Sequence, residues 1–367
     1  MRYICLSISF LFFLSSCDKD DSSEFVDGFD RNGMLTNWVD NIIIPSFNHL
    51  NNSLDNLNQA VDSFIANPDV NSHQELSDSW FEAYKSWQHV QMFNINLAED
   101  LEYQDKINSY PTDTDLINEN ISNNVTDLNI DGNESLAGFP AMDYMLHGLG
   151  SDVNSIIDQY VSSNLAESNK NYLKSIIESM MIITSQVAED WNNSRNSFIN
   201  STDNTATSSL NKIINDYIYY FEKYLRDGKF GIPAGIRSGG FIRPETVEGL
   251  YKRDVSKDLA LESLLACENF FTGNSINSIT NGVSLEDYLN YLPTSSENNL
   301  SQEVLSQFDE IEATINIINL NFYDQVNEDK FLMLNVWSDM QQMVALLKTD
   351  MLGALSIATD YTDTDGD

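Results

Sequence analysis

Hydrophobic residues recur every three or four positions along most of the chain, a spacing that predicts amphipathic helices. Ser72 and Glu75 have the spacing of a capping box, and the segment that follows, 76–93, places Leu76, Trp80, Ala83, Trp87 and Val90 on one stripe. The same spacing is found in the segments 34–65, 171–191, 209–225, 303–320 and 330–352. We interpret these segments as bundle helices.

Pro45 lies inside the first of these helices, so we expect a kink or a helix start beside it. No Asn-Gly or Asp-Gly pair separates two alternating apolar runs, so no hairpin is predicted. The pattern indicates an all-α protein made of two four-helix bundles, with the polar stretch 196–209 as the boundary between them. The expected domains are 35–202 and 203–367.

One stretch, 226–257, breaks the helical pattern. It holds six of the sixteen glycines and two of the seven prolines, which predicts a long irregular loop in the second domain. Seven bases against four acids give this stretch a charge of about +3. Such a loop is a candidate for binding an anion or a carboxylate through arginines and glycine amides. Alternatively, its bases pair with carboxylates of the neighbouring bundle and hold the two halves together.

The N-terminus has the layout of an export signal, with Arg2, an apolar run and then small residues before Cys17. Residues 14–17, LSSC, resemble a bacterial lipobox, which predicts cleavage after residue 16 and acylation of Cys17; an ordinary secretory signal is the alternative. The sequence CDKDDSS resembles the motif that sends Bacteroidetes lipoproteins to the outer face of the outer membrane, and otherwise the protein would face the periplasm. Residues 17–34 are then expected to be a lipidated, flexible tether.

The net charge and the cysteines of the chain limit which partners and which disulfides are possible. The formal charge is −37, or −38 once Arg2 is removed with the signal, which excludes nucleic acid as an electrostatic partner. Cys5 leaves with the signal and Cys17 carries lipid, so Cys267 remains alone and no intrachain disulfide is expected. Cys267 lies in an apolar helical segment and is expected to be a small buried residue.

Several blocks of sequence together resemble the imelysin family: SWFEAYKSWQHVQMFN, SYPTDTDLI, LAGFPAMDYMLHG, GIPAGIRSGGFIRPETVEG and LKTDMLGALSIATDYTDTDGD. The resemblance runs from about Leu35 to the C-terminus. It implies a two-domain helical bundle in the bacterial envelope and an association with iron acquisition. The family is also classified among the peptidases, which leaves enzymatic activity open.

The signature of this family is Gly-x-His-x-x-Glu, a motif proposed to bind metal. Here Gly138 matches, whereas Pro140 occupies the histidine position and Asp143 the glutamate position. Asp143 and His147, four residues apart, could rebuild a metal pair for iron or another divalent ion, although two ligands are too few on their own. In the alternative interpretation His147 is the basic residue in the last turn of a helix that Gly148 ends.

Other chemically suggestive residues have simpler explanations. The aromatic stripe Trp80, Tyr84, Trp87 and Phe93 is expected in the core, or as a ligand platform if one ring lines a cleft. The tail residues Asp360, Asp363, Asp365 and Asp367 resemble the start of a calcium loop but lack its closing glutamate, so an acidic tail is favoured. No standard catalytic motif was found, and no catalytic residue is assigned.

These observations lead to a functional hypothesis: a non-catalytic, lipid-anchored envelope protein that binds a ligand or metal complex in iron acquisition, with an uptake receptor as its expected partner. The binding residues are expected to meet in a cleft between the bundles, and they are Gly138, Asp143, Arg237, Ser238, Gly239, Arg243 and Glu245. Gly240 would add a second free backbone amide. The alternatives are a metallopeptidase of the imelysin family and a surface adhesion or scaffold protein.

Overall fold

The computed structural model describes residues 27–128, 132, 134–276, 280–293 and 299–359. Within these ranges the regular structure is helical, and the sole extended pairing is an isolated bridge between Asn274 and Asn281. The all-α prediction is therefore confirmed. None of the helices in this part of the chain is long and apolar enough to cross a membrane. The predicted signal peptide, Cys17 and the four tail aspartates lie outside the described residues.

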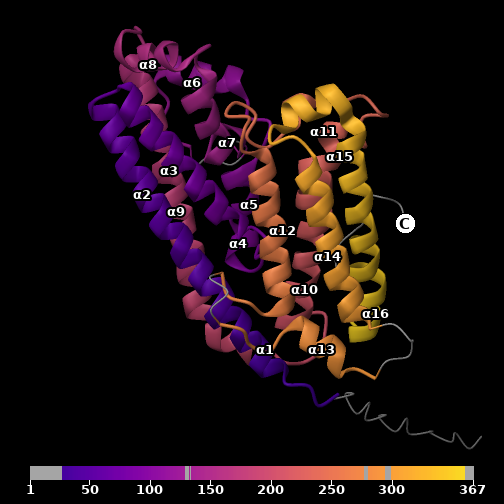
Figure 1. Ribbon diagram of the computed structural model, residues 1–367. Helices are drawn as coiled ribbons and strands as arrows, with labels where there is room; N and C mark the ends of the chain where they lie inside the picture. The colour runs from indigo at the N-terminus through magenta and orange to yellow at the C-terminus, as the bar shows by residue number, and fades with distance from the viewer. Residues whose placement is uncertain (1–26, 129–131, 133, 277–279, 294–298, 360–367) are drawn as a thin grey trace, which may run out of the picture.

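The first helix group lies on the left of Figure 1 and is built around the long helices α2, α3 and α9, which pack side by side. Its elements are α1 (Arg31–Asn37), η1 (Trp38–Ile43), α2 (Ile44–Ala66), α3 (Val70–Gln88), α4 (Leu97–Asp100), α5 (Tyr103–Asn108), α6 (Thr114–Asn123), η2 (Glu134–Leu136), α7 (Gly138–Asp143), η3 (Tyr144–Gly148), α8 (Val153–Val161) and α9 (Ala166–Ile199). The short helices α4, α5 and α7 lie between this group and α12, and α6 and α8 lie at its upper end (Figure 1).

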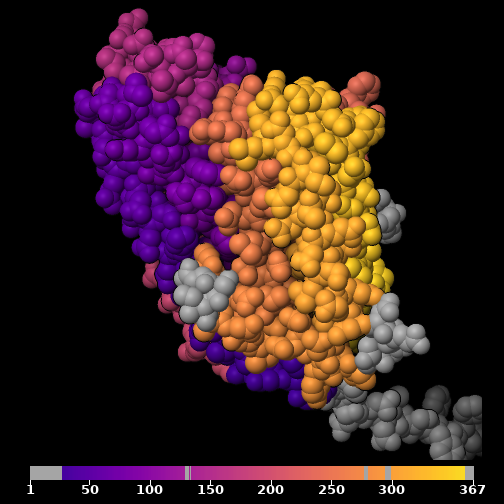
Figure 2. Space-filling view, viewed as in Figure 1, coloured from indigo at the N-terminus to yellow at the C-terminus, as the bar shows by residue number. Residues whose placement is uncertain are grey.

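The second group lies on the right of Figure 1 and is built around α10, α12, α14 and α15. Its elements are α10 (Ser209–Tyr219), η4 (Tyr220–Gly231), α11 (Ile232–Ala234), η5 (Pro244–Thr246), α12 (Ser256–Thr272), α13 (Leu285–Tyr291), α14 (Leu300–Ile317), α15 (Phe322–Ala345), η6 (Leu346–Met351) and α16 (Leu352–Leu355). Helix α12 contacts α3 on one side and α14 on the other, so it joins the two groups. Figure 2 shows the two groups in contact along the height of the molecule.

Local sequence explains where several helices begin and end. Pro45 lies inside a continuous helical segment, because α1, η1 and α2 follow one another without a break from Arg31 to Ala66. The wider π-helical turn η1 lies directly before Pro45, the residue that cannot donate a backbone hydrogen. The predicted capping box shifts by three residues: Asp69 caps α3 by accepting the amide of Ser72, whose hydroxyl in turn accepts the amide of Asp69. The prediction that Ser72 is the cap was wrong because a carboxylate three residues earlier provides the same pair of bonds.

Aromatic rings form much of the core and connect the two groups. Trp80, Tyr84 and Trp87 of α3 are buried, and so is Phe93 just beyond the helix, as expected for the aromatic stripe. Trp38 stacks on Phe270 with ring centroids 4.4 Å apart and donates its indole hydrogen to the Phe270 carbonyl. Because Trp38 belongs to η1 and Phe270 to α12, this contact holds the two helix groups together.

Two boundaries differ from the sequence prediction. The helical structure continues through Gly231 as η4 and then to Ala234, so the irregular stretch begins at Gly235 and not at residue 226. Near the N-terminus, Arg31 donates to Asp27 and Tyr288, and α1 buries Met34. The segment expected to be a flexible tether is thus packed against the second group from residue 27 onward.

Candidate functional site

A buried polar network lies where the two helix groups meet. Lys229 of η4 forms an ion pair with Glu248 and donates to Gln88 of α3 at 3.0 Å. Asn108 of α5 donates to the other Glu248 oxygen at 2.9 Å, and the Gln88 amide group approaches the same oxygen at 3.4 Å. We call these four residues the junction network. Burial lowers the pKa of Lys229, and the carboxylate of Glu248 opposes that effect.

The junction network extends into a layer of buried amides and hydroxyls. Gln91 donates to Gln88 and to the hydroxyl of Tyr220, and Ser263 donates to Gln88 at 2.6 Å. Gln104 donates to Gln91 at 3.5 Å, while its own side-chain oxygen is buried without a hydrogen-bond partner. Polar side chains from α3, α5, η4 and α12 are therefore desolvated together at one place.

A second charged cluster lies beneath the irregular stretch. The fully buried guanidinium of Arg226 contacts the ring of Trp337 at 5.1 Å and the carboxylates of Glu222 and Asp227 at 3.7 and 3.2 Å. Trp337 donates to Asp227 at 2.8 Å. Asp227 in turn accepts two hydrogen bonds from Arg237, whose side chain is 37% exposed. The buried cluster thus fixes the orientation of a guanidinium that reaches solvent.

The predicted binding residues of the irregular stretch lie on the segment 235–247, which we call the arginine loop. Arg243 lies 3.5 Å from Glu245, and both side chains are more than half exposed. Ser238 donates to the Phe241 carbonyl. Gly239 has a positive φ and open space around its Cα, whereas the Gly240 amide is bonded to the Gly235 carbonyl. The expectation that Gly240 offers a free amide was therefore wrong, because that amide closes the turn.

Asp143 does not lie on the arginine loop; it is the last residue of α7, and 1% of its surface is exposed. One oxygen accepts the Tyr251 amide at 2.8 Å and the other accepts the Lys252 amide at 2.9 Å. Burial raises the pKa of Asp143 to about 7, against the lowering effect of these two hydrogen bonds. Asp143 was expected to face Arg237 and Arg243 in a cleft, but its hydrogen-bond partners are the backbone amides of Tyr251 and Lys252. Its hydrogen bonds go to these amides, and the arginines bond to Asp227 and Glu245.

The remaining motif residues are placed by packing. Gly138 has φ +74°, and a Cβ there would lie 2.1 Å from the Ile107 carbonyl oxygen. Pro140 is buried in the first turn of α7. His147 lies in the last turn of η3, 3.3 Å from the Ser77 hydroxyl, with the rings of His73 and Trp80 at 5.7 and 5.6 Å. The helix-end interpretation of His147 agrees with this position.

These residues do not fit a metal ion at the motif position. Pro140 has no donor atom, both oxygens of Asp143 accept amide hydrogens, and His147 contacts a hydroxyl and two rings. A zinc site requires three or four ligands and a calcium site six or more oxygens. Among the described residues, no group of three or more His, Cys, Asp or Glu side chains is arranged to hold an ion.

Comparison with known proteins identifies the family. A profile of the peptidase M75 family, described as imelysin, matches residues 43–334. The chain belongs to the imelysin family. An imelysin-like protein from Psychrobacter arcticum 273-4 shares the fold with a TM-score of 0.70 and 15% identity, over 90% of this chain and 97% of that one. An iron-regulated protein A precursor from Parabacteroides distasonis ATCC 8503 also shares the fold. Its TM-score is 0.71 and its sequence identity 18%, over 88% of this chain and 95% of that one. No curated protein matches.

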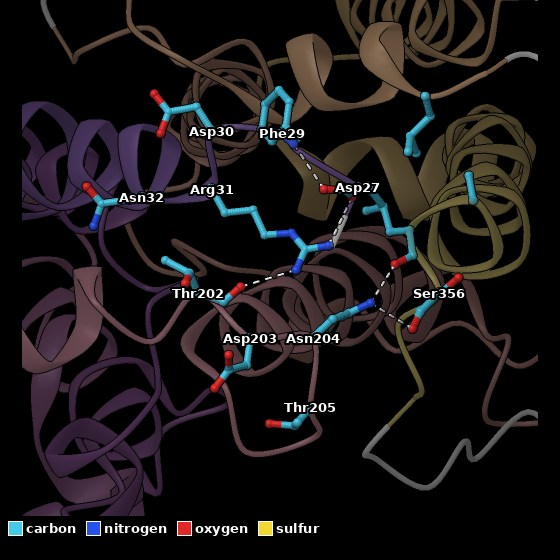
Figure 3. A pocket seen from close by; sticks show the side chains of 13 residues that line it. Asp27, Phe29, Asp30, Arg31, Asn32, Thr202, Asp203, Asn204, Thr205 and Ser356 are labelled. Atoms are coloured by element: carbon cyan, nitrogen blue, oxygen red, sulfur yellow. Dashed lines mark hydrogen bonds and ion pairs between the residues drawn. The ribbon is translucent and has the colours of Figure 1, made fainter. Parts of the chain in front are cut away.

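This imelysin chain also contains a cavity of about 640 Å³ that the sequence did not predict (Figure 3). It lies between the N-terminal segment, the turn after α9 and the end of α16. Arg31 donates to the Thr202 carbonyl at 3.2 Å, and Asn204 donates to the carbonyls of Leu355 and Ser356 at 3.0 and 3.2 Å. These polar groups of the wall bond to one another and tie three distant segments together.

The junction network was also missed by the sequence analysis. Lys229 and Glu248 were counted within the basic stretch, but nothing in the sequence paired them with each other or with α3. One signal was present: Gln88 is the last residue of α3, a helix rich in buried aromatics, and Gln91 lies in the turn that follows it. Two glutamines at the edge of an apolar stripe are typical of a buried polar layer, although their partners cannot be inferred.

Acid stability of this imelysin chain should depend on His147. Burial lowers the pKa of His147 to about 3 from an ordinary value of 6.5, so between these pH values the unfolded chain binds the extra proton. The stability contributed by the neutral ring is therefore lost as pH falls from 6.5 toward 3. We expect His147→Gln to show a shallower loss of melting temperature over this range, measured by differential scanning calorimetry. Parallel profiles for the two proteins would contradict this expectation.

Proposed function

We propose that this imelysin-family protein is a lipid-anchored protein of the outer membrane, exposed at the cell surface, that binds an anionic iron complex without hydrolysing a substrate and passes it to an uptake receptor. The export signal and Cys17 support the anchor. The fold shared with an iron-regulated protein A precursor supports the iron context. We also propose that the two helix groups are four-helix-bundle-like domains, 35–202 and 203–367, and that the Gly/Pro-rich arginine loop belongs to the second.

The observation that carries this proposal is the exposed cationic loop in a chain of charge −37. Arg237 and Arg243 both reach solvent, and Lys330 of α15 donates to the Gly240 carbonyl at 2.6 Å. Phe241, in the same loop, is 77% exposed. Guanidinium groups bind carboxylate and phosphate oxygens in a fixed geometry, and an exposed ring adds apolar contact. Anionic oxygen around a chelated ferric ion fits this combination.

Preorganisation favours the arginine loop over other basic residues. Arg237 is held by Asp227, which Trp337 and the buried Arg226 hold in turn. A guanidinium fixed in this way loses less conformational entropy when a ligand binds than a flexible surface arginine does. The contacts of Asp143 and His147 support a role without hydrolysis, since both side chains have bonding partners inside the protein.

Calorimetric titration with ferric citrate tests the proposal. We expect saturable binding to the mature chain, and we expect Arg237→Ala/Arg243→Ala to weaken it by about tenfold or more, because charge-assisted hydrogen bonds contribute about 1.5–3 kcal/mol each. The control is Arg195→Ala, which removes a surface guanidinium that pairs with Asp40 on the first helix group. This control should leave the affinity unchanged.

Other outcomes distinguish the alternative functions. Stoichiometric zinc together with cleavage of a peptide substrate would overturn the proposal in favour of a metallopeptidase. If neither ferric citrate nor zinc binds the wild-type chain, an adhesion or scaffold role replaces ligand binding. Equal weakening by Arg195→Ala would show that binding reflects general electrostatics and not the arginine loop.

A further inference from the structure

The segment that receives Asp143 is a tight turn, residues 249–254, which we call the interface turn. Gly249 and Arg253 both have positive φ values, and the Arg253 amide bonds to the Gly249 carbonyl at 2.8 Å. This conformation leaves two consecutive amides, those of Tyr251 and Lys252, pointing toward α7. Successive backbone amides of this kind form a concave site for an anion. The anion here is the carboxylate of Asp143 itself.

Packing around the interface turn brings the same two segments together. The rings of Tyr144 and Tyr251 lie 5.2 Å apart. A Cβ at Gly148 would lie 2.7 Å from the Tyr251 ring and 2.4 Å from the Tyr144 ring, so glycine is required for this close approach. Ser256, just after the turn, donates to the Glu248 carbonyl at 2.6 Å and so connects the turn to the junction network.

We propose that Asp143 is a clasp between the two helix groups and that the motif position used for metal in the family signature here binds the backbone of the interface turn instead. Each carboxylate oxygen accepts one amide hydrogen, at 2.8 and 2.9 Å, so both oxygens bind groups within the chain. Pro140 removes the second ligand of the signature and lies in the first turn of the helix that ends at Asp143. The remnant of a metal motif thereby positions a loop of the second helix group on the first.

The clasp predicts a specific pattern of amide exchange. Asparagine has the shape of aspartate but only one acceptor oxygen, so Asp143→Asn leaves one of the two amides facing a donor group. We expect amide exchange across the interface turn to rise by about tenfold or more in this variant, because one of the two hydrogen bonds to residue 143 is lost. Exchange in α2 and α9 should remain unchanged, as measured by hydrogen–deuterium exchange mass spectrometry.

Three further measurements complete the test. Asp152→Asn alters an exposed helix cap of α8 and should change exchange in that helix alone. Gly148→Ala places a methyl group against the rings of Tyr144 and Tyr251 while keeping the carboxyl group of Asp143, and it should raise exchange in the interface turn as Asp143→Asn does. Zinc and ferrous ion are titrated into wild type and Asp143→Asn with elemental analysis, and neither should bind stoichiometrically. One bound ion per wild-type chain that Asp143→Asn abolishes, or unchanged exchange in the turn for both variants, would overturn the clasp.

Discussion

Replacing Lys229 with methionine should destabilise the protein by about 3–5 kcal/mol, because the substitution leaves the carboxylate of Glu248 buried without its cation. Both side chains of this pair are 2% exposed. Asn108 and Gln88 would still approach Glu248, but neutral amides do not replace a full charge. Urea unfolding followed by far-ultraviolet circular dichroism measures the change in midpoint.

A double mutant separates loss of the charge pair from loss of packing. In Lys229→Met/Glu248→Gln both charges are gone, and the amide oxygen of glutamine can still accept from Asn108. We expect this double variant to be more stable than Lys229→Met alone, since the orphaned charge is removed. The control Lys212→Met changes an exposed lysine of α10 and should stay within about 0.5 kcal/mol of wild type. A small effect of Lys229→Met would show that the junction network is solvated and carries little energy.

The helical periodicity was sufficient to predict the fold class and much of the core. Trp80, Tyr84 and Trp87 repeat at helical spacing and are all buried, because burying an apolar stripe drives the packing of each helix whatever its partner. The spacing does not identify which stripes face each other. Trp38 stacking on Phe270 joins segments 232 residues apart, and such contacts depend on the arrangement of the whole bundle.

The candidate site was harder to predict because its contacts are polar and distant in sequence. Asp143 was expected to face the arginines of the irregular stretch, but its partners are the amides of residues 251 and 252, and nearly every residue has such an amide. The charges of the side chains had suggested the arginines as the partners of Asp143. Gln88 reaches Glu248 across 160 residues, and the sequence contains no local pattern for that contact. Sequence composition therefore located the loop, while backbone geometry determined what it binds.

Substituting alanine at Gly138 should be among the most damaging single changes in the first helix group. At φ +74° an alanine is strained by about 1–2 kcal/mol, and the new Cβ would lie 2.1 Å from the Ile107 carbonyl oxygen. Backbone atoms cannot move aside as a flexible side chain can, so α5 and α7 must separate, at a further cost of about 1–3 kcal/mol. The glycine of the family signature is therefore required here by packing between two helices, independently of any metal.

Substitutions at two other glycines separate the cost of backbone strain from the cost of the close contact with Ile107. Gly239 has φ +64° and open space around it, so Gly239→Ala should show the backbone strain alone, about 1–2 kcal/mol. Gly353 lies in α16 with a helical φ and no neighbour within 4 Å, so Gly353→Ala should stabilise the protein by about 0.5–1 kcal/mol. Thermal unfolding of the three variants ranks their stabilities relative to wild type. If Gly138→Ala costs no more than Gly239→Ala, then α5 yields to the extra methyl group and the close approach to Ile107 does not restrain the start of α7.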